Sequence, residues 1–387
     1  MTHSPIIEVR DLVKVYRNFD RREGLRGALQ DLFKRRYRSI RAVDNISFSI
    51  GRGEIVGYIG ANGAGKSTTI KMLTGILAPT SGSISINGLD PLKQRYAHAR
   101  QIGVVFGQRT QLWWDLAVIE AFHLLQKIYL IPQAEYKARL ERFVEVLDIS
   151  GQLHQPVRKL SLGQRMKCDL AASLLHNPPL LFLDEPTIGL DVAVKERVRR
   201  FIKEINQEGD VTIILTTHDM TDIEELCDRI IIIDGGKVLY DGSRPDLLAQ
   251  YAQRRRIIIE LSGAALTAYA GTAPPDASLP LAFAYGSLDE PGARQFMAAL
   301  YKAARGGLEH PPVDSVRIRR LDPYHFQISF DRSAYSGSDV IGRLLEHFQI
   351  ADLALHEPEL GDIVRAIYEG RVPSPLPALA AGVAEKH

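Results

Sequence analysis

A glycine-rich stretch, GANGAGKST (Gly60–Thr68), constrains the fold of this 387-residue chain more than any other feature. It follows the apolar run GEIVGYIG, which is typical of a buried strand, and it precedes KSTTIKMLTGI, which is typical of a helix. The spacing fits G-x-x-x-x-G-K-[ST], in which glycines let the backbone wrap around phosphate groups and present N–H groups to them. The strand–loop–helix context therefore predicts a phosphate-binding loop in an α/β protein.

Further apolar runs lie at 102–106, 180–184, 211–216 and 229–233, with helical patterns between them. This alternation predicts a mostly parallel sheet covered by helices on both faces. The pieces before Gly53, together with SGSISING and GKVLYDG, are typical of antiparallel strands, so we expect a mixed sheet with an antiparallel β-subdomain. Only helical patterns occur from about 109 to 178, which predicts a helical subdomain inserted in the α/β core.

The rhythm of the chain changes after residue 242, where we place the end of the first domain. A linker at 243–255 leads to a second domain at 256–371, whose element order βαββαβ is that of a small, ferredoxin-like α+β domain. Dimerisation, regulation and effector binding all remain open as its role. The Pro/Ala-rich tail at 372–387 is expected to be disordered.

The composition is that of an ordinary soluble globular protein, with 45% apolar and 24% charged residues. A formal net charge of +2 is too small to imply a nucleic-acid partner. Cys168 and Cys227 lie in apolar surroundings without a CxxC pattern, which favours a reducing compartment and no disulfide or zinc site. No window approaches the roughly 18 apolar residues of a membrane span, and no signal-peptide pattern is present. We expect a cytoplasmic protein.

Two adjacent carboxylates end the apolar run LLFLDEP (Leu180–Pro186). Asp184 is expected to hold Mg²⁺ through water, and Glu185 to polarise an attacking water. In the glycine-rich loop, Lys66 is expected to reach the β- and γ-phosphates of a nucleotide, and the Ser67 hydroxyl to bind Mg²⁺. A chance glycine loop or a solvated acidic turn explains either motif alone, but not both together. The pair predicts nucleotide hydrolysis.

Three further motifs accompany these two. LSLGQRMK (Leu160–Lys167) opens a helix with Ser161 as its N-cap, Gln108 follows the run at 102–106, and TTHD (Thr216–Asp219) follows the run at 211–216. In order and approximate spacing, the five motifs resemble the nucleotide-binding domain of ABC transporters over residues 5–242. The resemblance is closest to exporter-type (ABC-2) ATPases of the drug, daunorubicin or viologen class. It implies the P-loop NTPase fold of an ABC ATPase and hydrolysis of ATP with Mg²⁺.

The resemblance also implies residue roles. Catalysis is assigned to Glu185, His218, Lys66 and Gln108, and the metal to Ser67, Gln108 and Asp184. The nucleotide-binding residues are Tyr16, Gly60, Ala61, Asn62, Gly63, Ala64, Gly65, Lys66, Ser67, Thr68, Ser161, Gly163, Gln164 and Asp191. Of these, Ser161 and Gly163 would contact a γ-phosphate bound by the opposite subunit. His218 resembles the histidine that reads the γ-phosphate, although a lone histidine after a strand is usually a surface residue.

The sequence departs from the family pattern at two of these motifs. Leu162 stands where the family usually has glycine, which restricts the backbone but keeps Ser161 and Gly163. Ile188–Gly189 replaces the usual serine–alanine before Asp191, so communication between subunits through this loop is left open.

The adenine-stacking aromatic is assigned to Tyr16, at the end of the first strand, and stacking of this kind contributes roughly 1–3 kcal/mol. A segment at 17–41 separates Tyr16 from the rest of the motif, so Phe19 and Tyr37 are alternatives. The segment has nine Lys/Arg against three acids and apolar residues at helical spacing, which predicts a basic amphipathic helix. It either lies on anionic lipid or covers an edge of the β-subdomain.

The only two tryptophans, Trp113 and Trp114, lie in FGQRTQLWWD (Phe106–Asp115). By resemblance, Gln108 senses Mg²⁺ and the γ-phosphate, and the loop after it borders the groove that receives a membrane partner. We expect one ring in the core of the helical subdomain and the other at the groove, where aromatic side chains act as interface anchors.

Together these features predict the ATPase subunit of an ABC exporter. One phosphate loop and one LSLGQ signature (Leu160–Gln164) cannot complete a shared site, so we expect a head-to-tail dimer with a second copy or a paralogous ATPase subunit. Multi-span permease subunits, contacted near Gln108–Asp115, would hold it at the inner face of the cell membrane. The alternatives are a soluble ABC-type ATPase acting on nucleic acid or ribosomes, which usually has two cassettes or a long coiled coil, and a non-catalytic ATP-binding regulator. No nucleic-acid partner is expected.

Overall fold

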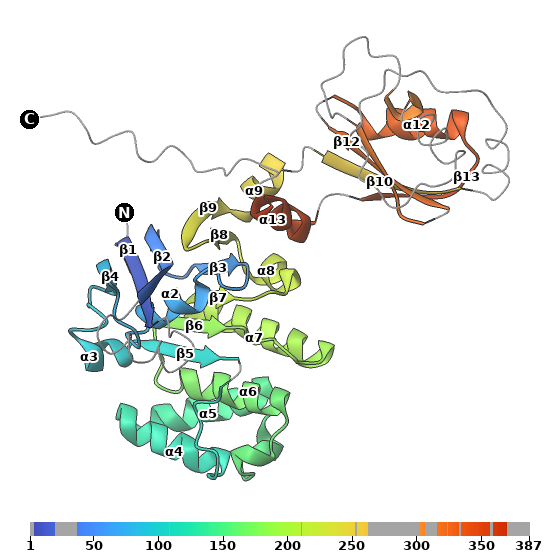
Figure 1. The fold of residues 1–387 in the computed structure, drawn as a ribbon. Helices are drawn as coiled ribbons and strands as arrows, with labels where there is room; N and C mark the ends of the chain where they lie inside the picture. The colour runs from blue at the N-terminus through green and yellow to red at the C-terminus, as the bar shows by residue number, and fades with distance from the viewer. Residues whose placement is uncertain are drawn as a thin grey trace, which may run out of the picture. The chain divides into compact units, whose positions relative to one another are not determined.

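The computed structural model describes residues 4–19, 37–107, 109–209, 211–251, 254–261, 300, 302–305, 316–322, 324–332, 334–356 and 359–369. These residues fall into two compact units, one within Met1–Arg244 and Val364–His387 and the other within Pro245–Ile363 (Figure 1). Helix α9 (Arg244–Tyr251) occupies much of the segment expected as a linker.

The centre of the first unit is a six-stranded sheet of order β5-β6-β7-β3-β8-β9. Its strands are β3 (Ile55–Gly60), β5 (Ile102–Phe106), β6 (Leu180–Asp184), β7 (Thr212–Thr216), β8 (Arg229–Asp234) and β9 (Lys237–Ser243). The first five are parallel and β9 is antiparallel to β8. The mixed sheet predicted from the apolar runs is thereby confirmed, and the carboxyl ends of β3, β6 and β7 lie at one edge.

A second sheet of the first unit has the order β2-β1-β4 and is antiparallel. It consists of β1 (Ile7–Phe19), β2 (Tyr37–Ile50) and β4 (Ser81–Ile86). It shares a core with the six-stranded sheet, in which the rings of Phe48 and Tyr58 lie 5.9 Å apart.

The basic segment at 17–41 is a correction to the sequence prediction. Its two ends are strands, because Phe19 pairs with Tyr37 and the antiparallel ladder uses their backbone hydrogen bonds. A helix therefore does not extend over the whole segment, and residues 20–36 lie outside the described part of the chain.

Helices complete the first unit (Figure 1). They are α2 (Lys66–Leu73), α3 (Arg95–Ala99), α4 (Val118–Tyr129), α5 (Gln133–Leu147), α6 (Leu162–Leu174), α7 (Val192–Gly209) and α8 (Met220–Leu226), with short 3₁₀ turns at Ser150–Gln152 and Val157–Lys159. Helices α4, α5 and α6 gather at one end of the unit, as the helical patterns predicted. The edge-to-face rings of Phe143 and Phe201, 5.7 Å apart, join α5 to α7.

The expected division of the two tryptophans between core and groove is wrong. Trp113 is 40% exposed and Trp114 is 51% exposed. The core of the helical end is formed instead by other side chains, such as Leu112 and Phe122. The indole of Trp114 lies 5.4 Å from the guanidinium of Arg165 on α6, within the range of a cation–π contact.

The second unit is built on an antiparallel sheet of order β11-β12-β10-β13. Its elements are β10 (Arg254–Leu261), β11 (Val316–Arg320), β12 (His325–Asp331), α12 (Gly337–His347) and β13 (Ile350–His356), and α13 (Leu360–Tyr368) is divided between the units. Helical residues at 300 and 302–305 precede β11. Alternate residues of β12, including Phe326 and Ile328, enter the core.

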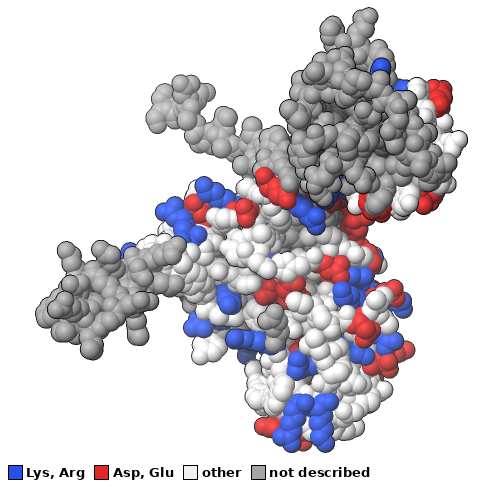
Figure 2. Space-filling model, turned by 45° about the vertical axis from the view of Figure 1, so that its right-hand side comes forward, with Lys and Arg blue, Asp and Glu red and all other residues white. Residues whose placement is uncertain are grey.

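Helix length and surface charge both concern possible partners. Within the ranges given above, no helix is both long enough and apolar enough to span a membrane. On the face shown in Figure 2, basic and acidic side chains are interspersed over the described surface, in keeping with the small net charge.

Candidate active site

The loop Gly60–Thr68 joins the end of β3 to the start of α2. Gly65 has φ of 109°, in the left-handed region that glycine adopts without strain. A Cβ atom at this position would also lie 2.4 Å from the carbonyl oxygen of Ala42. Glycine at 65 thus allows the loop to wrap closely and to direct the first turn of α2 into the site.

Lys66 lies over its own loop. Its Nζ donates hydrogen bonds to the carbonyl oxygens of Gly60 at 2.5 Å and Ala61 at 3.2 Å. Burial lowers the pKa of the ammonium, and the nearby carboxylates of Glu185 and Asp184 oppose that shift. The Lys66 side chain therefore lies at the point where the loop and the carboxyl end of β6 meet.

The ends of β5, β6 and β7 hold the two carboxylates. The hydroxyl of Thr216 donates to Oδ1 of Asp184 at 2.5 Å, and the N–H of Glu185 donates to the carbonyl oxygen of Thr216 at 2.9 Å. Glu185 has φ of 58°, a conformation that costs a non-glycine residue about 1–3 kcal/mol. A Cβ atom on Gly107 would lie 2.1 Å from the carbonyl oxygen of Glu185, so only glycine permits this close approach of β5 and β6.

His218 lies directly after β7 and faces Glu185, with Nε2 3.0 Å from Oε1. Burial raises the pKa of Glu185, and the charges of His218 and Lys66 oppose that shift. A carboxylate with a raised pKa, fixed beside a histidine and a lysine, can hold and polarise a water molecule.

A cleft of about 660 Å³ brings these groups together, which is a volume suited to a nucleotide-sized ligand. The residues expected from the sequence that line it are Ala61, Asn62, Gly63, Gly65, Lys66, Ser67, Thr68, Asp184, Glu185 and His218. The lining that was not expected consists of Ala42, Lys71, Ile76, Phe106, Gly107, Arg109 and Ile188. Gly60 and Ala64 lie in the same loop but do not line the cleft.

A second set of expected residues does not line this cleft. Ser161 caps α6, because its Oγ accepts from the N–H of Gln164 at 3.2 Å while the Gln164 side chain accepts from the N–H of Ser161 at 2.9 Å. Gly163 lies in the first turn of the same helix. Asp191 accepts from the N–H of Val194 at 2.9 Å at the start of α7.

Two further residues, Tyr16 and Gln108, were expected at the nucleotide or the metal. Tyr16 lies on β1 opposite Ile40, with the ammonium of Lys14 5.5 Å from its ring centroid, and does not line the cleft. Gln108 lies outside the described residues, between Gly107 and Arg109.

The residues present fit a magnesium ion. Ser67 and Asp184 line the same cleft and offer a hydroxyl and a carboxylate oxygen, the hard oxygen ligands that Mg²⁺ prefers beside phosphate groups.

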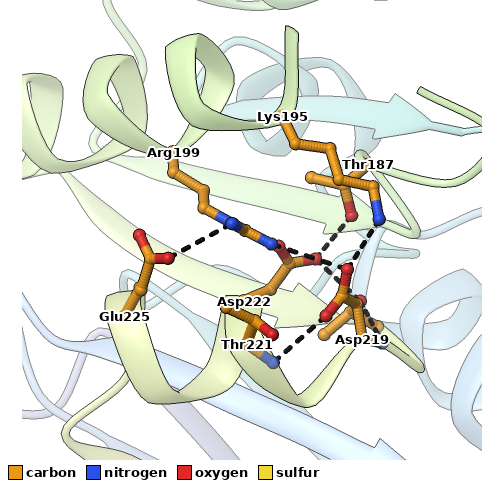
Figure 3. Close-up of polar contacts among 8 residues, drawn as sticks. Thr187, Lys195, Arg199, Asp219, Thr221, Asp222 and Glu225 are labelled. Carbon is orange, nitrogen blue, oxygen red and sulfur yellow. Dashed lines mark hydrogen bonds and ion pairs between the residues drawn. The ribbon is translucent and has the colours of Figure 1, made fainter. Parts of the chain in front are cut away.

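Several contributing residues were missed by sequence reasoning. Thr216 belongs to the quoted TTHD motif, so its place beside the strand end was available as a signal. A buried polar cluster around Asp222 and Arg199 lies next to the loops that follow β6 and β7 (Figure 3). No sequence motif pointed to this cluster.

Comparison with known proteins supports the geometry. The family model described as ABC transporter matches residues 43–188. The ABC transporter ATP-binding protein NatA of Bacillus subtilis is 34% identical over 56% of this chain and 87% of its own length. The linearmycin resistance ATP-binding protein LnrL of the same species is 34% identical over 59% of this chain and 73% of its own length. The methionine import ATP-binding protein MetN of Geobacillus kaustophilus is 35% identical over 53% of this chain and 60% of its own length.

A solved structure agrees with the fold. The ATP-binding cassette MJ0796, solved as a dimer in a post-hydrolysis state with ADP and Pi, is 26% identical. It superimposes on 61% of this chain and 98% of its own length with a TM-score of 0.51. With a strand-borne phosphate loop, paired carboxylates and a facing histidine in one cleft, this chain belongs to the ATP-binding proteins of ABC transporters and is an ATPase.

Proposed function

We propose that the chain drives an ABC exporter by hydrolysing ATP at the interface of two cassettes. The observation that carries the proposal is the separation of two groups of residues. The phosphate loop, Asp184, Glu185 and His218 share a cleft, whereas Ser161 and Asp191 lie elsewhere on the unit. A second copy, or a paralogous subunit, placed head to tail would bring its Ser161 to the open side of the cleft. The dimer of MJ0796 supports this arrangement.

The chain's own groups then divide the work. Lys66 and the backbone N–H groups of the loop bind the β- and γ-phosphates. Glu185 accepts a hydrogen bond from the attacking water and draws its proton, and His218 holds Glu185 in place from 3.0 Å. Ser67, Asp184 and Gln108 would hold Mg²⁺, which when bound neutralises charge on the β- and γ-phosphates.

The membrane partner is proposed to bind at the segment Gln108–Asp115. Trp113 and Trp114 are both exposed and adjacent, and tryptophan side chains are enriched among interface hot spots. Exposed apolar residues of α4, Leu124 and Ile128, lie in the same helical subdomain. Through this contact, multi-span permease subunits would hold the chain at the inner face of the cell membrane. Export as the direction of transport is supported by the similarity to LnrL.

The experiment is a tagged pull-down from detergent-solubilised membranes. Wild type is compared with Trp113→Ala/Trp114→Ala and with Tyr96→Ala, a control that removes a ring 93% exposed on α3. All three proteins are first shown to bind ATP equally. We expect a multi-span protein with wild type and Tyr96→Ala, but not with the double variant.

Recovery with all three proteins would keep the transporter and reject the tryptophan anchor. Recovery of ribosomes, nucleic acid or nothing from wild type would reject the transporter. Direction is measured in inverted membrane vesicles that contain the chain and its captured partner, using a panel of fluorescent drugs. Accumulation that depends on ATP is expected for export, and release of preloaded drug would show import.

A further inference from the structure

A buried carboxylate links the two loops that carry Glu185 and His218 (Figure 3). Asp222 on α8 is fully buried, and its Oδ2 accepts from the hydroxyl of Thr187 at 2.5 Å and from that of Thr217 at 2.9 Å. Thr187 lies two residues after Glu185, and Thr217 directly precedes His218. One carboxylate oxygen therefore joins the loop after β6 to the loop after β7.

The charge of Asp222 is matched by Arg199, whose side chain is 8% exposed. Nε of Arg199 donates to Oδ1 of Asp222 at 2.6 Å, so both carboxylate oxygens are occupied. A buried ion pair of this kind adds little net stability compared with an apolar pair of similar volume. The ion pair supplies a defined geometry instead, because Thr187, Thr217 and Arg199 each donate to one particular oxygen of Asp222.

The same cluster reaches the loop of His218 a second time. Asp219, the residue after His218, accepts from Nζ of Lys195 on α7 at 2.7 Å and from the N–H of Thr221 at 3.1 Å. Both neighbours of His218 are thus held by hydrogen bonds to α7 and α8, while the imidazole itself remains half exposed in the cleft.

We propose that Asp222 is a positioning residue for ATP hydrolysis: its carboxylate, neutralised by Arg199, holds Thr187 and Thr217 together and so keeps Glu185 and His218 in contact. The inference rests on the proposed roles of Glu185 and His218. Asp222 does not line the cleft, so it acts on turnover through these two residues and not through contact with ATP.

The test uses Thr187→Val in the full chain, because Thr187 is 2% exposed, does not line the cleft and has its hydroxyl bonded to Asp222. Valine keeps the shape and removes the hydroxyl. Misplacement of a catalytic group by about 1 Å lowers turnover roughly 100-fold, so we expect kcat to fall roughly 10- to 100-fold while KM for MgATP stays unchanged. Thr187→Ser should restore most of the lost kcat.

The fall in kcat at unchanged KM, and its rescue by Thr187→Ser, form a reading that a purely structural role would not give. Asp222→Asn keeps the shape of the side chain and removes the charge that accepts from both threonines, so kcat should fall in the same way. Glu225→Gln, which removes an outer partner of Arg199 that is 41% exposed, serves as the control with an unchanged kcat.

Two results separate this inference from the proposed function. If Glu185→Gln is inactive but Thr187→Val keeps the wild-type kcat and only melts earlier, Asp222 is structural and the inference is wrong. If Glu185→Gln keeps the wild-type kcat, the assigned role of Glu185 fails and the inference fails with it. In the double variant Thr187→Val/Glu185→Gln we expect no loss beyond Glu185→Gln alone, since Thr187 acts through the contact of His218 with the Glu185 carboxylate, which Glu185→Gln already removes. A further loss would show that Asp222 acts elsewhere.

Discussion

The cleft and the start of α6 place polar side chains in different surroundings. In the cleft, Lys66, Glu185 and His218 come from separate loops, partly lose their water and face one another. At the start of α6, Ser161 and Gln164 satisfy each other within one turn and face outward. In the cleft, charged groups are already in position to interact with a bound phosphate. The start of α6 is complete as a helix cap, and in the proposed function it contacts a phosphate only when a second subunit binds.

Under the proposed function, one part of the catalytic apparatus is assembled by folding and the other by association. Substitutions in the cleft should therefore affect the nucleotide site of a single chain, while substitutions at the start of α6 should affect ATP turnover only in the associated form. Each prediction below tests one side of this division.

Glu185→Gln should have the largest effect. A general base contributes roughly 10²- to 10⁴-fold to a rate, so kcat should fall by that factor while ATP still binds and the ATP-bound dimer accumulates. Phosphate release and light scattering measure the two effects. Glu196→Gln, an exposed carboxyl-to-amide change on α7, is the matched control. A wild-type hydrolysis rate in Glu185→Gln would remove the residue from its role.

Lys66→Ala should act one step earlier, on binding. Loss of a partly buried, charge-assisted contact of about 3 kcal/mol lowers ATP affinity roughly 100-fold. Equilibrium titration of the single chain with a fluorescent ATP analogue measures the change. Lys137→Ala, at a lysine whose side chain is 73% exposed, is the control. Unchanged affinity would contradict the assignment of the loop.

Asp169 connects the two regions, and its ionisation should change the free energy of unfolding with pH. It lies on α6 and accepts from the hydroxyl of Thr110 at 2.8 Å and the N–H of Gln111 at 3.1 Å, just after Gln108. Burial raises the pKa of Asp169 from an ordinary value of 3.8 to about 6. Because the folded state binds this proton more tightly than the unfolded state, the Asp169 contribution to the free energy of unfolding decreases as pH rises from 4 through about 6.

Asp169→Asn removes that titration. The free energy of unfolding of the variant, minus that of wild type, should increase by on the order of 2 kcal/mol between about pH 4 and pH 8. Urea unfolding at several pH values measures the difference. A difference that stays constant with pH would show that the Asp169 pKa is not raised.

Ser161→Ala should have the smallest effect on the single chain. Loss of the cap costs about 1 kcal/mol of stability, ATP affinity of the isolated chain should not change, and turnover of the dimer should fall roughly 10-fold. Ser161→Asp keeps the cap but places a negative charge where the partner's γ-phosphate would lie. It should therefore keep the stability and lose ATP-dependent dimerisation. If Ser161→Asp dimerises and turns over like wild type, the division into two halves is wrong.

Local patterns were sufficient for the elements whose chemistry is local. The run LLFLDEP predicted a buried strand ending in two carboxylates, and β6 ends at Asp184. The serine before LGQR predicted a helix cap, and Ser161 forms one. In both cases, neighbouring residues determine the outcome through a strand end or a first helical turn.

The predictions that failed depended on distant partners. Whether a ring at Trp113 or Trp114 is buried is decided by α4 and α6, which fill the core without them. Whether residues 37–41 are helix or strand is decided by pairing with β1, which overrides a helical spacing of apolar residues.

The sequence by itself determined the phosphate loop, the acidic strand end and the helix cap at Ser161, because each is encoded in a few adjacent residues. It also determined the mixed α/β sheet, because the alternation of apolar runs and helical patterns extends over the whole domain. Only the tertiary structure decided that His218 lies 3.0 Å from Glu185, that Gly107 permits the approach of β5 to β6, and that Asp222 lies between Thr187 and Thr217. The physical reason is that parallel strands bring their carboxyl ends to one edge whatever their separation in sequence. Burial at that edge then shifts the pKa values of the side chains that meet there.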